Sequence, residues 1–162
     1  MEKRDHEKYM KKAIELSRRA AIIEKSGGVF GAVVVNPQGE IIGEGYNQVS
    51  KTHDPRWHAE MQAIGEACKK MGTPHLDGCD LYTSAECCPM CLATAYWAHI
   101  RHIYFASTTE DSLKYGNFAD IGILEQICKP HEEQQIKATQ MMQKEAVEVW
   151  KEFASMPDKV HY

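Results

Sequence analysis

The sequence predicts an α/β fold, a three-layer α-β-α sandwich around a mixed, roughly five-stranded sheet. Short β-branched or apolar segments alternate with segments of helical periodicity, and Gly- and Pro-containing turns separate them. The expected order is helix, strand, strand, helix, strand, helix, strand, with a helical remainder, which fits a sheet covered by helices on both faces. At 162 residues the chain can bury a sizeable core without disulfides, so we expect a single domain over residues 1–162.

The first half of the chain contains two predicted helices and a hairpin. Residues 5–25 have apolar or small side chains at steps of three and four, which predicts a helix packed on one side. Residues 31–35 and 41–46 are short apolar segments separated by a turn, so they predict the first two strands. A polar loop then leads to His58, where a second helix is expected to begin.

The second half continues the alternation of strands and helices. Pro89 stands where proline favours the first turn of a helix. Residues 136–141 fit either a fifth strand or an extended link. The other elements expected here are strands at 81–83 and 102–106 and helices at 109–115, 121–127 and 144–154.

Composition limits the classes of function. Hydrophobic residues make up 43% and charged residues 26%, and no apolar run approaches the roughly 18 to 20 residues of a membrane span. The first twelve residues lack the apolar segment of a signal peptide, so we expect a cytosolic protein whose six cysteines stay thiols or bind metal. A net charge of -4 disfavours a nucleic-acid partner, and the mixed charges near the N-terminus indicate a solvated helix side in preference to an RNA-binding patch.

Four residues in two short motifs suggest a catalytic metal site. His58 and the pair Cys88 and Cys91 supply one imidazole and two thiolates, which leaves the fourth position of a tetrahedral zinc open for water. Glu60 follows His58 by two residues. Because the chain is entering a helix there, both side chains can face one pocket, and Glu60 can move a proton.

Each motif alone has a simpler interpretation. A Cys-x-x-Cys pair can be half of a structural zinc ribbon or a redox pair, and a lone His-x-Glu can be a helix cap or a surface feature. Together, with Pro89 directly after Cys88, they match the His-x-Glu and Pro-Cys-x-x-Cys signature of zinc deaminases. Cys87 stands where that signature has proline, and we expect it to be a neighbour of the site and not a ligand.

These motifs and their surroundings resemble the cytidine deaminase-like superfamily, and within it the small bacterial guanine deaminases. The metal motif identifies the superfamily. The Tyr-Trp-Ala step, the acidic residue after Phe118 and the terminal tyrosine point to the guanine enzymes. The segments of resemblance are 29–33, 53–55, 58–60, 81–84, 88–92, 96–98, 116–120 and 160–162.

The resemblance implies hydrolytic deamination of guanine to xanthine and ammonia, a step of purine metabolism, with one zinc per chain. It places the zinc on His58, Cys88 and Cys91, with Glu60 as the proton shuttle and Asp120 near the departing amine. The substrate contacts that it implies are Phe30, Asn47, Ala59, Trp97 and Tyr162.

The resemblance also implies a homodimer. Similar enzymes exchange their C-terminal part between subunits, here about residues 130–162. Tyr162 would then close the partner's pocket.

Several alternatives remain open. Asn47 suits a turn, Phe30 and Trp97 suit a core, and Asp120 suits a helix N-cap. A terminal Tyr162 is ordinarily disordered. Rival substrates are cytosine, an aminotriazine and adenosine in tRNA. A zinc-stabilised binding module without turnover is a more remote alternative, against which the presence of Glu60 argues.

Overall fold

The computed structural model describes residues 5–118 and 121–160. The chain forms two compact units, Met1–Ile123 and Leu124–Tyr162. Asp120 and Tyr162, two of the predicted site residues, lie outside the described residues.

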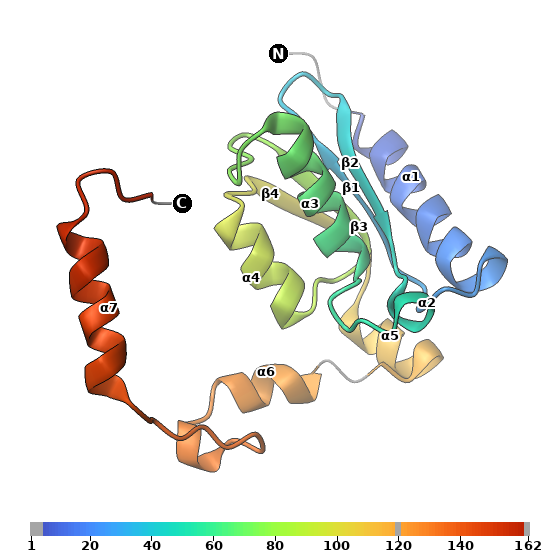
Figure 1. Ribbon diagram of the computed structural model, residues 1–162. Helices are drawn as coiled ribbons and strands as arrows, with labels where there is room; N and C mark the ends of the chain where they lie inside the picture. Colours follow the sequence, from blue (N-terminus) through green and yellow to red (C-terminus); the bar gives the residue numbers. More distant parts are fainter. Residues whose placement is uncertain (1–4, 119–120, 161–162) are drawn as a thin grey trace. The chain divides into compact units, whose positions relative to one another are not determined.

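The first unit is built on a four-stranded mixed sheet (Figure 1). Its strands are β1 (Gly31–Val35), β2 (Ile41–Tyr46), β3 (Asp80–Ala85) and β4 (His102–Ser107), in the spatial order β2-β1-β3-β4. β1 pairs antiparallel with both β2 and β3, whereas β3 and β4 are parallel and are connected through a helix. This is the mixed α/β sheet that the sequence predicts.

Helices cover both faces of this sheet (Figure 1). On one face lies α1 (His6–Arg18), extended by a π-helical turn at Arg19–Ile23. The other face is covered by α3 (Ala59–Met71) and α4 (Pro89–Trp97). The three expected layers are therefore present in the first unit.

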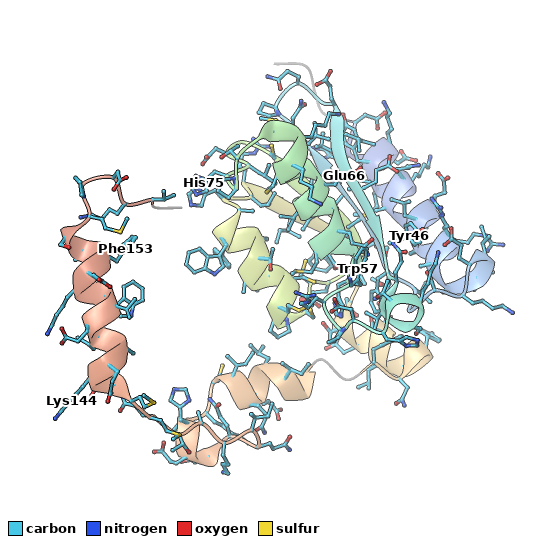
Figure 2. The ribbon with its side chains drawn as sticks, viewed as in Figure 1. Tyr46, Trp57, Glu66, His75, Lys144 and Phe153 are labelled. Atoms are coloured by element: carbon cyan, nitrogen blue, oxygen red, sulfur yellow. The ribbon has the colours of Figure 1, made fainter. Side chains whose placement is uncertain are left out.

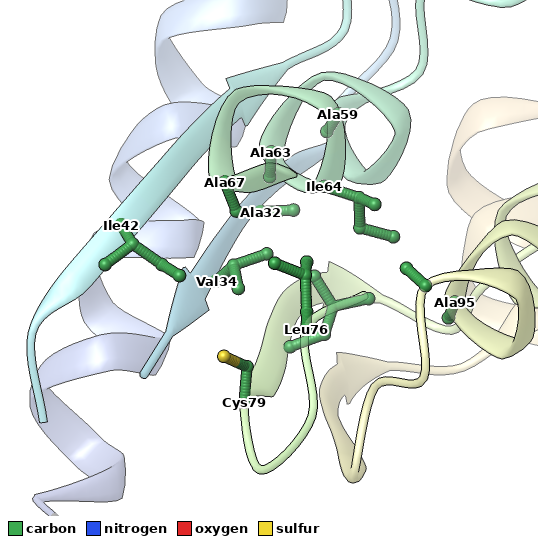
Figure 3. Close-up of a cluster of buried hydrophobic side chains, with 12 residues drawn as sticks. Ala32, Val34, Ile42, Ala59, Ala63, Ile64, Ala67, Leu76, Cys79 and Ala95 are labelled. Atoms are coloured by element: carbon green, nitrogen blue, oxygen red, sulfur yellow. The ribbon is translucent and has the colours of Figure 1, made fainter. Parts of the chain in front are cut away.

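The side chains of β1 explain why helices pack on both faces of the sheet. All five residues of this strand are buried. Ala32 and Val34 join the cluster under α3 and α4 (Figure 3), whereas Val33 and Val35 pack with Tyr9 of α1 on the opposite face. Because successive side chains of a strand point to opposite faces, a continuous apolar run requires apolar layers on both sides.

Two glycines let α3 approach β2 closely. A Cβ placed on Gly43 would lie 2.1 Å from the backbone oxygen of Ala63, and one on Gly45 would lie 2.0 Å from that of Ala59. Any side chain at these positions would push the helix away from the sheet. Since His58 is the N-cap residue of α3 and Glu60 lies in its first turn, the two glycines help to position them.

The strands and helices follow the sequence predictions with two differences, in the number of strands and in one short helix. The described sheet has four strands, not about five. Residues 136–141 form no strand, so the second alternative, an extended link, is the correct one. The short α2 (Val49–Thr52) was not predicted, whereas α5 (Thr109–Gly116) lies where a helix was expected.

The second unit consists of helices and links. It contains most of α6 (Ile121–Ile127), a 3-10 turn at His131–Glu133, and α7 (Gln143–Ser155). None of its described residues is buried, and α7 exposes Val149 and Trp150. Within the described part of the chain, no helix has the length and apolarity needed to cross a membrane.

Candidate active site

His58, Cys88 and Cys91 come together in the first unit as a group able to hold a metal ion. His58 is the N-cap residue of α3, Cys88 is the N-cap residue of α4, and Cys91 lies in the first turn of α4. The Nδ1 atom of His58 lies 3.6 Å from the Sγ atom of Cys88 and 3.6 Å from that of Cys91. Two helix N-termini thus meet at one point, as the sequence predicts.

These distances fit zinc. Bond lengths of about 2.0–2.1 Å to nitrogen and about 2.3 Å to sulfur, at a tetrahedral angle, place the two ligand atoms about 3.6 Å apart. The two nitrogen–sulfur distances match that value. One imidazole and two thiols are also ligands that zinc prefers, and three protein ligands leave one position open.

The N-termini of α3 and α4 favour both the geometry and the charge of these ligands. His58 and Cys88 both have extended backbone conformations, and neither side chain caps its own helix. Pro89 at the first helical position favours this geometry. Helix N-termini stabilise negative charge, which favours the thiolate form that zinc binds.

The two ligand thiols influence each other's pKa. A hydrogen bond with Cys91, supported by the nearby His58 ring, lowers the pKa of Cys88 to about 4. The same hydrogen bond, together with burial, raises the pKa of Cys91. The thiolate form of Cys88 is therefore favoured, and a bound cation would also favour that of Cys91.

Glu60 lies next to this group and is almost completely buried, with 4% of its surface exposed. Its Oε1 atom accepts a hydrogen bond of 3.0 Å from the Thr83 hydroxyl, and its Oε2 atom lies 3.5 Å from the Cys91 Sγ atom. Burial raises the pKa of the Glu60 carboxyl, which makes the protonated form easier to populate. A carboxyl group in this position can give and take a proton.

A cavity of about 360 Å³ opens beside these residues, a size typical of small-molecule sites. Its walls include Phe30 and Asn47, whose contact with substrate stays a prediction, and all of its walls come from the first unit. The lining residues are Gly27, Gly28, Phe30, Asn47, Val49, Ser50, His58, Glu60, Glu86, Cys88 and Phe118.

Backbone N–H groups fix the orientation of the Asn47 side-chain amide. Its Oδ1 atom accepts hydrogen bonds from the backbone N–H groups of Gly28 and Val49, each 3.2 Å long. The residue is 4% exposed. Since the carbonyl oxygen has these two partners, the Nδ2 amide is the group that Asn47 can offer to a ligand as a donor.

The sequence analysis did not name several residues of the site, among them Phe118 and Thr83. Phe118 lines the cavity and meets Phe30 edge to face, with ring centroids 5.0 Å apart. Asn117, in a left-handed conformation at the end of α5, turns the chain there. The segment around Phe118 belongs to the resemblance, which could have indicated it. Thr83 on β3 gave no signal, because only the fold brings it to Glu60.

Other predicted site residues are not brought to the cavity wall. Trp97, at the end of α4, is 67% exposed, and Ala59 is packed in the core under the sheet. Cys87 is partly buried and is not a member of the metal-binding group, and burial raises the pKa of its thiol. The roles of Ala59, Trp97 and the undescribed Asp120 and Tyr162 stay predictions.

The α/β fold and the His-Cys-Cys group beside a buried glutamate define a zinc-binding hydrolytic deaminase. The family model "Cytidine and deoxycytidylate deaminase zinc-binding region" matches residues 3–107, and the chain belongs to this family.

Known relatives include enzymes with different substrates. A guanine deaminase of Bacillus subtilis (strain 168) is 41% identical over 154 residues, which cover 93% of this chain and 97% of that protein. An X-ray structure of guanine deaminase from Bacillus subtilis has a TM-score of 0.92 and 39% identity, and covers 98% of this chain and 99% of that chain. A tRNA-specific adenosine deaminase of Aquifex aeolicus is 39% identical over 101 residues, 62% of this chain and 65% of that enzyme.

Proposed function

We propose that this protein hydrolyses guanine to xanthine and ammonia. The observation that supports this most strongly is the buried Glu60 beside the His58, Cys88 and Cys91 group, on the wall of a cavity lined by two aromatic rings. A guanine deaminase is also 41% identical to this chain over 93% of its length.

The chemistry assigns distinct tasks to the residues of the site. His58, Cys88 and Cys91 would hold the zinc, which when bound supplies Lewis acidity and a water-derived nucleophile near neutral pH. Glu60, whose pKa is raised by burial, gives a proton to the ring nitrogen next to the amine-bearing carbon. The Glu60 carboxylate takes a proton from the water as the water oxygen adds to that carbon, and passes this proton to the amine. The C–N bond then breaks to release ammonia, and the hydroxyl proton of the adduct returns to Glu60 as the carbonyl of xanthine forms.

The cavity wall suits a flat, neutral purine. Phe30 and Phe118 meet edge to face, and their rings provide an apolar boundary for a planar base. The Nδ2 amide of Asn47 can donate to an acceptor on the purine edge, because its Oδ1 atom is held by backbone N–H groups. Asp120 would assist the departing amine, as the resemblance implies.

The second unit supports a dimer with exchanged C-terminal parts. Trp150 and Phe153 of α7 lie edge to face at 6.2 Å, yet no described residue of this unit is buried. An amphipathic helix whose apolar side stays in water is poorly stabilised, so α7 needs another surface. We propose that residues from about 130 to 162 pack on a second copy, with Tyr162 closing its pocket. A cytosolic location stays a prediction.

Ammonia release over a panel of substrates tests this function. Zinc-loaded protein is incubated with guanine, cytosine, cytidine, an aminotriazine and a tRNA anticodon stem-loop. We expect the highest kcat/KM with guanine. If adenosine in the stem-loop or cytosine proves the better substrate, the proposed substrate is wrong, although the deaminase family stands.

A further inference from the structure

A second group of possible metal ligands lies in the first unit, apart from the active site. It consists of one nitrogen from each of His75 and His99 and a carboxylate oxygen of Asp77, and these atoms all lie within 4.8 Å of one another. The Nδ1 atom of His99 is 3.5 Å from the Oδ1 atom of Asp77. Two ligands bound at about 2.1 Å to one tetrahedral ion lie about 3.4 Å apart, so this pair is already at the required separation.

The rings of His75 and His99 lie face to face. They are stacked, with centroids 4.2 Å apart and an angle of 9° between the planes. Because the nitrogen lone pairs of an imidazole lie in the plane of its ring, a side-chain rotation of one ring is needed for both nitrogens to point at one ion. His75 is partly buried, whereas Asp77 and His99 are exposed, so an ion could enter without any rearrangement of the core.

The group lies at the opposite ends of the two helices that bear the zinc ligands. His75 follows the C-terminus of α3, and His99 follows that of α4, whereas His58 and Cys88 stand at the two N-termini. Figure 2 shows His75 at the far end of α3 from Trp57, which precedes His58. Nine residues of α4 separate the groups by about 13 Å.

This location favours a cation. The C-terminal end of a helix carries a partial negative charge, and here two helices end close to the same three side chains. The effect is the reverse of that at the active site, where the helix N-termini favour thiolates.

Backbone hydrogen bonds fix the two segments that supply the ligands. The N–H of Leu76, between His75 and Asp77, donates to the oxygen of Ala98 over 2.7 Å, and the N–H of Arg101 donates to the oxygen of Cys79 over 2.9 Å. His99 has a φ of +55°, an unfavourable conformation for a residue with a side chain. The ligand-bearing loops are therefore preorganised, and part of the cost of ordering a site is already met.

We propose that His75, Asp77 and His99 bind a second divalent transition-metal ion, of the class that prefers imidazole ligands, such as zinc, nickel or copper. Two imidazoles and one carboxylate form a donor set that these ions accept, with the remaining positions filled by water. The ion links the loop after α3 to the loop after α4. It therefore stabilises the first unit and takes no part in turnover.

Calorimetric titration of Ni²⁺ into the zinc-loaded protein tests this site. We expect one nickel ion to bind per chain while the zinc content stays unchanged. His75→Ala and His99→Ala should each weaken nickel binding by at least about 10-fold, the lower end of what loss of a supporting contact costs at metal sites. His131→Ala, at an exposed histidine in the second unit, is the matched control and should bind as the unchanged protein does.

Two further measurements keep the test decisive. Nickel should raise the Tm of the unchanged protein and of His131→Ala, but not that of His99→Ala. Asp77→Asn alters only an exposed side chain, so it reports on the site even if a histidine variant fails to fold, and it should weaken binding too. Equal nickel binding by the unchanged protein and by Asp77→Asn or a folded histidine variant, no binding at all, or binding only by displacement of zinc would overturn the proposal.

Discussion

The two units of the chain differ in how they use apolar side chains. In the first, β1 and β3 are completely buried between α1 on one face and α3 and α4 on the other. In the second, α7 has apolar residues at helical spacing, yet all of its described residues except Phe153 are exposed. The first unit has a core of its own and contains the described part of the active site, whereas no described residue of the second is buried.

The contrast between the two units suggests that metal binding and closure of the cavity depend on different parts of the chain. Metal binding depends on two helix starts and a sheet that lie within Met1–Ile123. Closure of the cavity, in contrast, is proposed to depend on the second unit of another copy. Loss of a metal ligand in the first unit should therefore remove both zinc and turnover, whereas truncation of the second unit should remove turnover and leave the zinc in place. The following experiments test this difference.

The largest expected effect is that of Cys91→Ala. This change removes a completely buried zinc ligand, so both zinc and guanine turnover should be lost. Metal analysis and ammonia release measure the two quantities. Cys87→Ala is the matched control at the neighbouring thiol and should retain zinc. If Cys91→Ala kept its zinc, or Cys87→Ala lost it, the set of ligands would be wrong.

Deletion of residues 158–162 should remove turnover without removing zinc. The deleted residues follow α7 and include Tyr162, which we propose closes the partner's cavity. Exclusion of water and completion of the site often depend on such closing segments. Guanine turnover, zinc content and thermal unfolding are measured together. Full activity in the truncated enzyme would show that the second unit is not needed for catalysis.

A smaller effect is expected within the first unit from Gly45→Ala. The new Cβ would lie 2.0 Å from the Ala59 oxygen, so α3 must move, at a cost of about 1–3 kcal/mol in the free energy of unfolding. Gly65→Ala is the matched control in α3 itself, because nothing lies within 4 Å of its Cβ. That change should stabilise the helix by about 0.5–1 kcal/mol. Denaturant unfolding distinguishes them, and equal stability of both variants would contradict the close packing of α3 on β2.

Local patterns were sufficient to predict most elements of the first unit. The hairpin strands 31–35 and 41–46 have the expected bounds, and Pro89 opens α4 as predicted. The metal group was also predictable, since its residues occur in two compact motifs that each lie at a helix start. These features depend on neighbours in the sequence, which a pattern can show.

Features that depend on distant contacts were not predictable. Thr83 reaches Glu60 across 23 positions, and Phe118 reaches Phe30 across an even longer stretch of chain. Whether residues 136–141 form a fifth strand depends on an edge partner, which the sequence does not reveal, and the described sheet ends at β4. The exposure of Trp97 likewise depends on which side of α4 faces the sheet.

Glu60→Gln tests the central claim, that a buried carboxyl beside the zinc group moves the proton. Glutamine has nearly the same shape and can still bond to Thr83, so zinc content and guanine binding should persist. Turnover should fall by roughly a thousandfold, the typical contribution of a positioned acid-base group. Glu66→Gln, at an exposed position of the same helix, is the matched control and should stay active. A Glu60→Gln enzyme with full zinc content and undiminished turnover of guanine would contradict the mechanism.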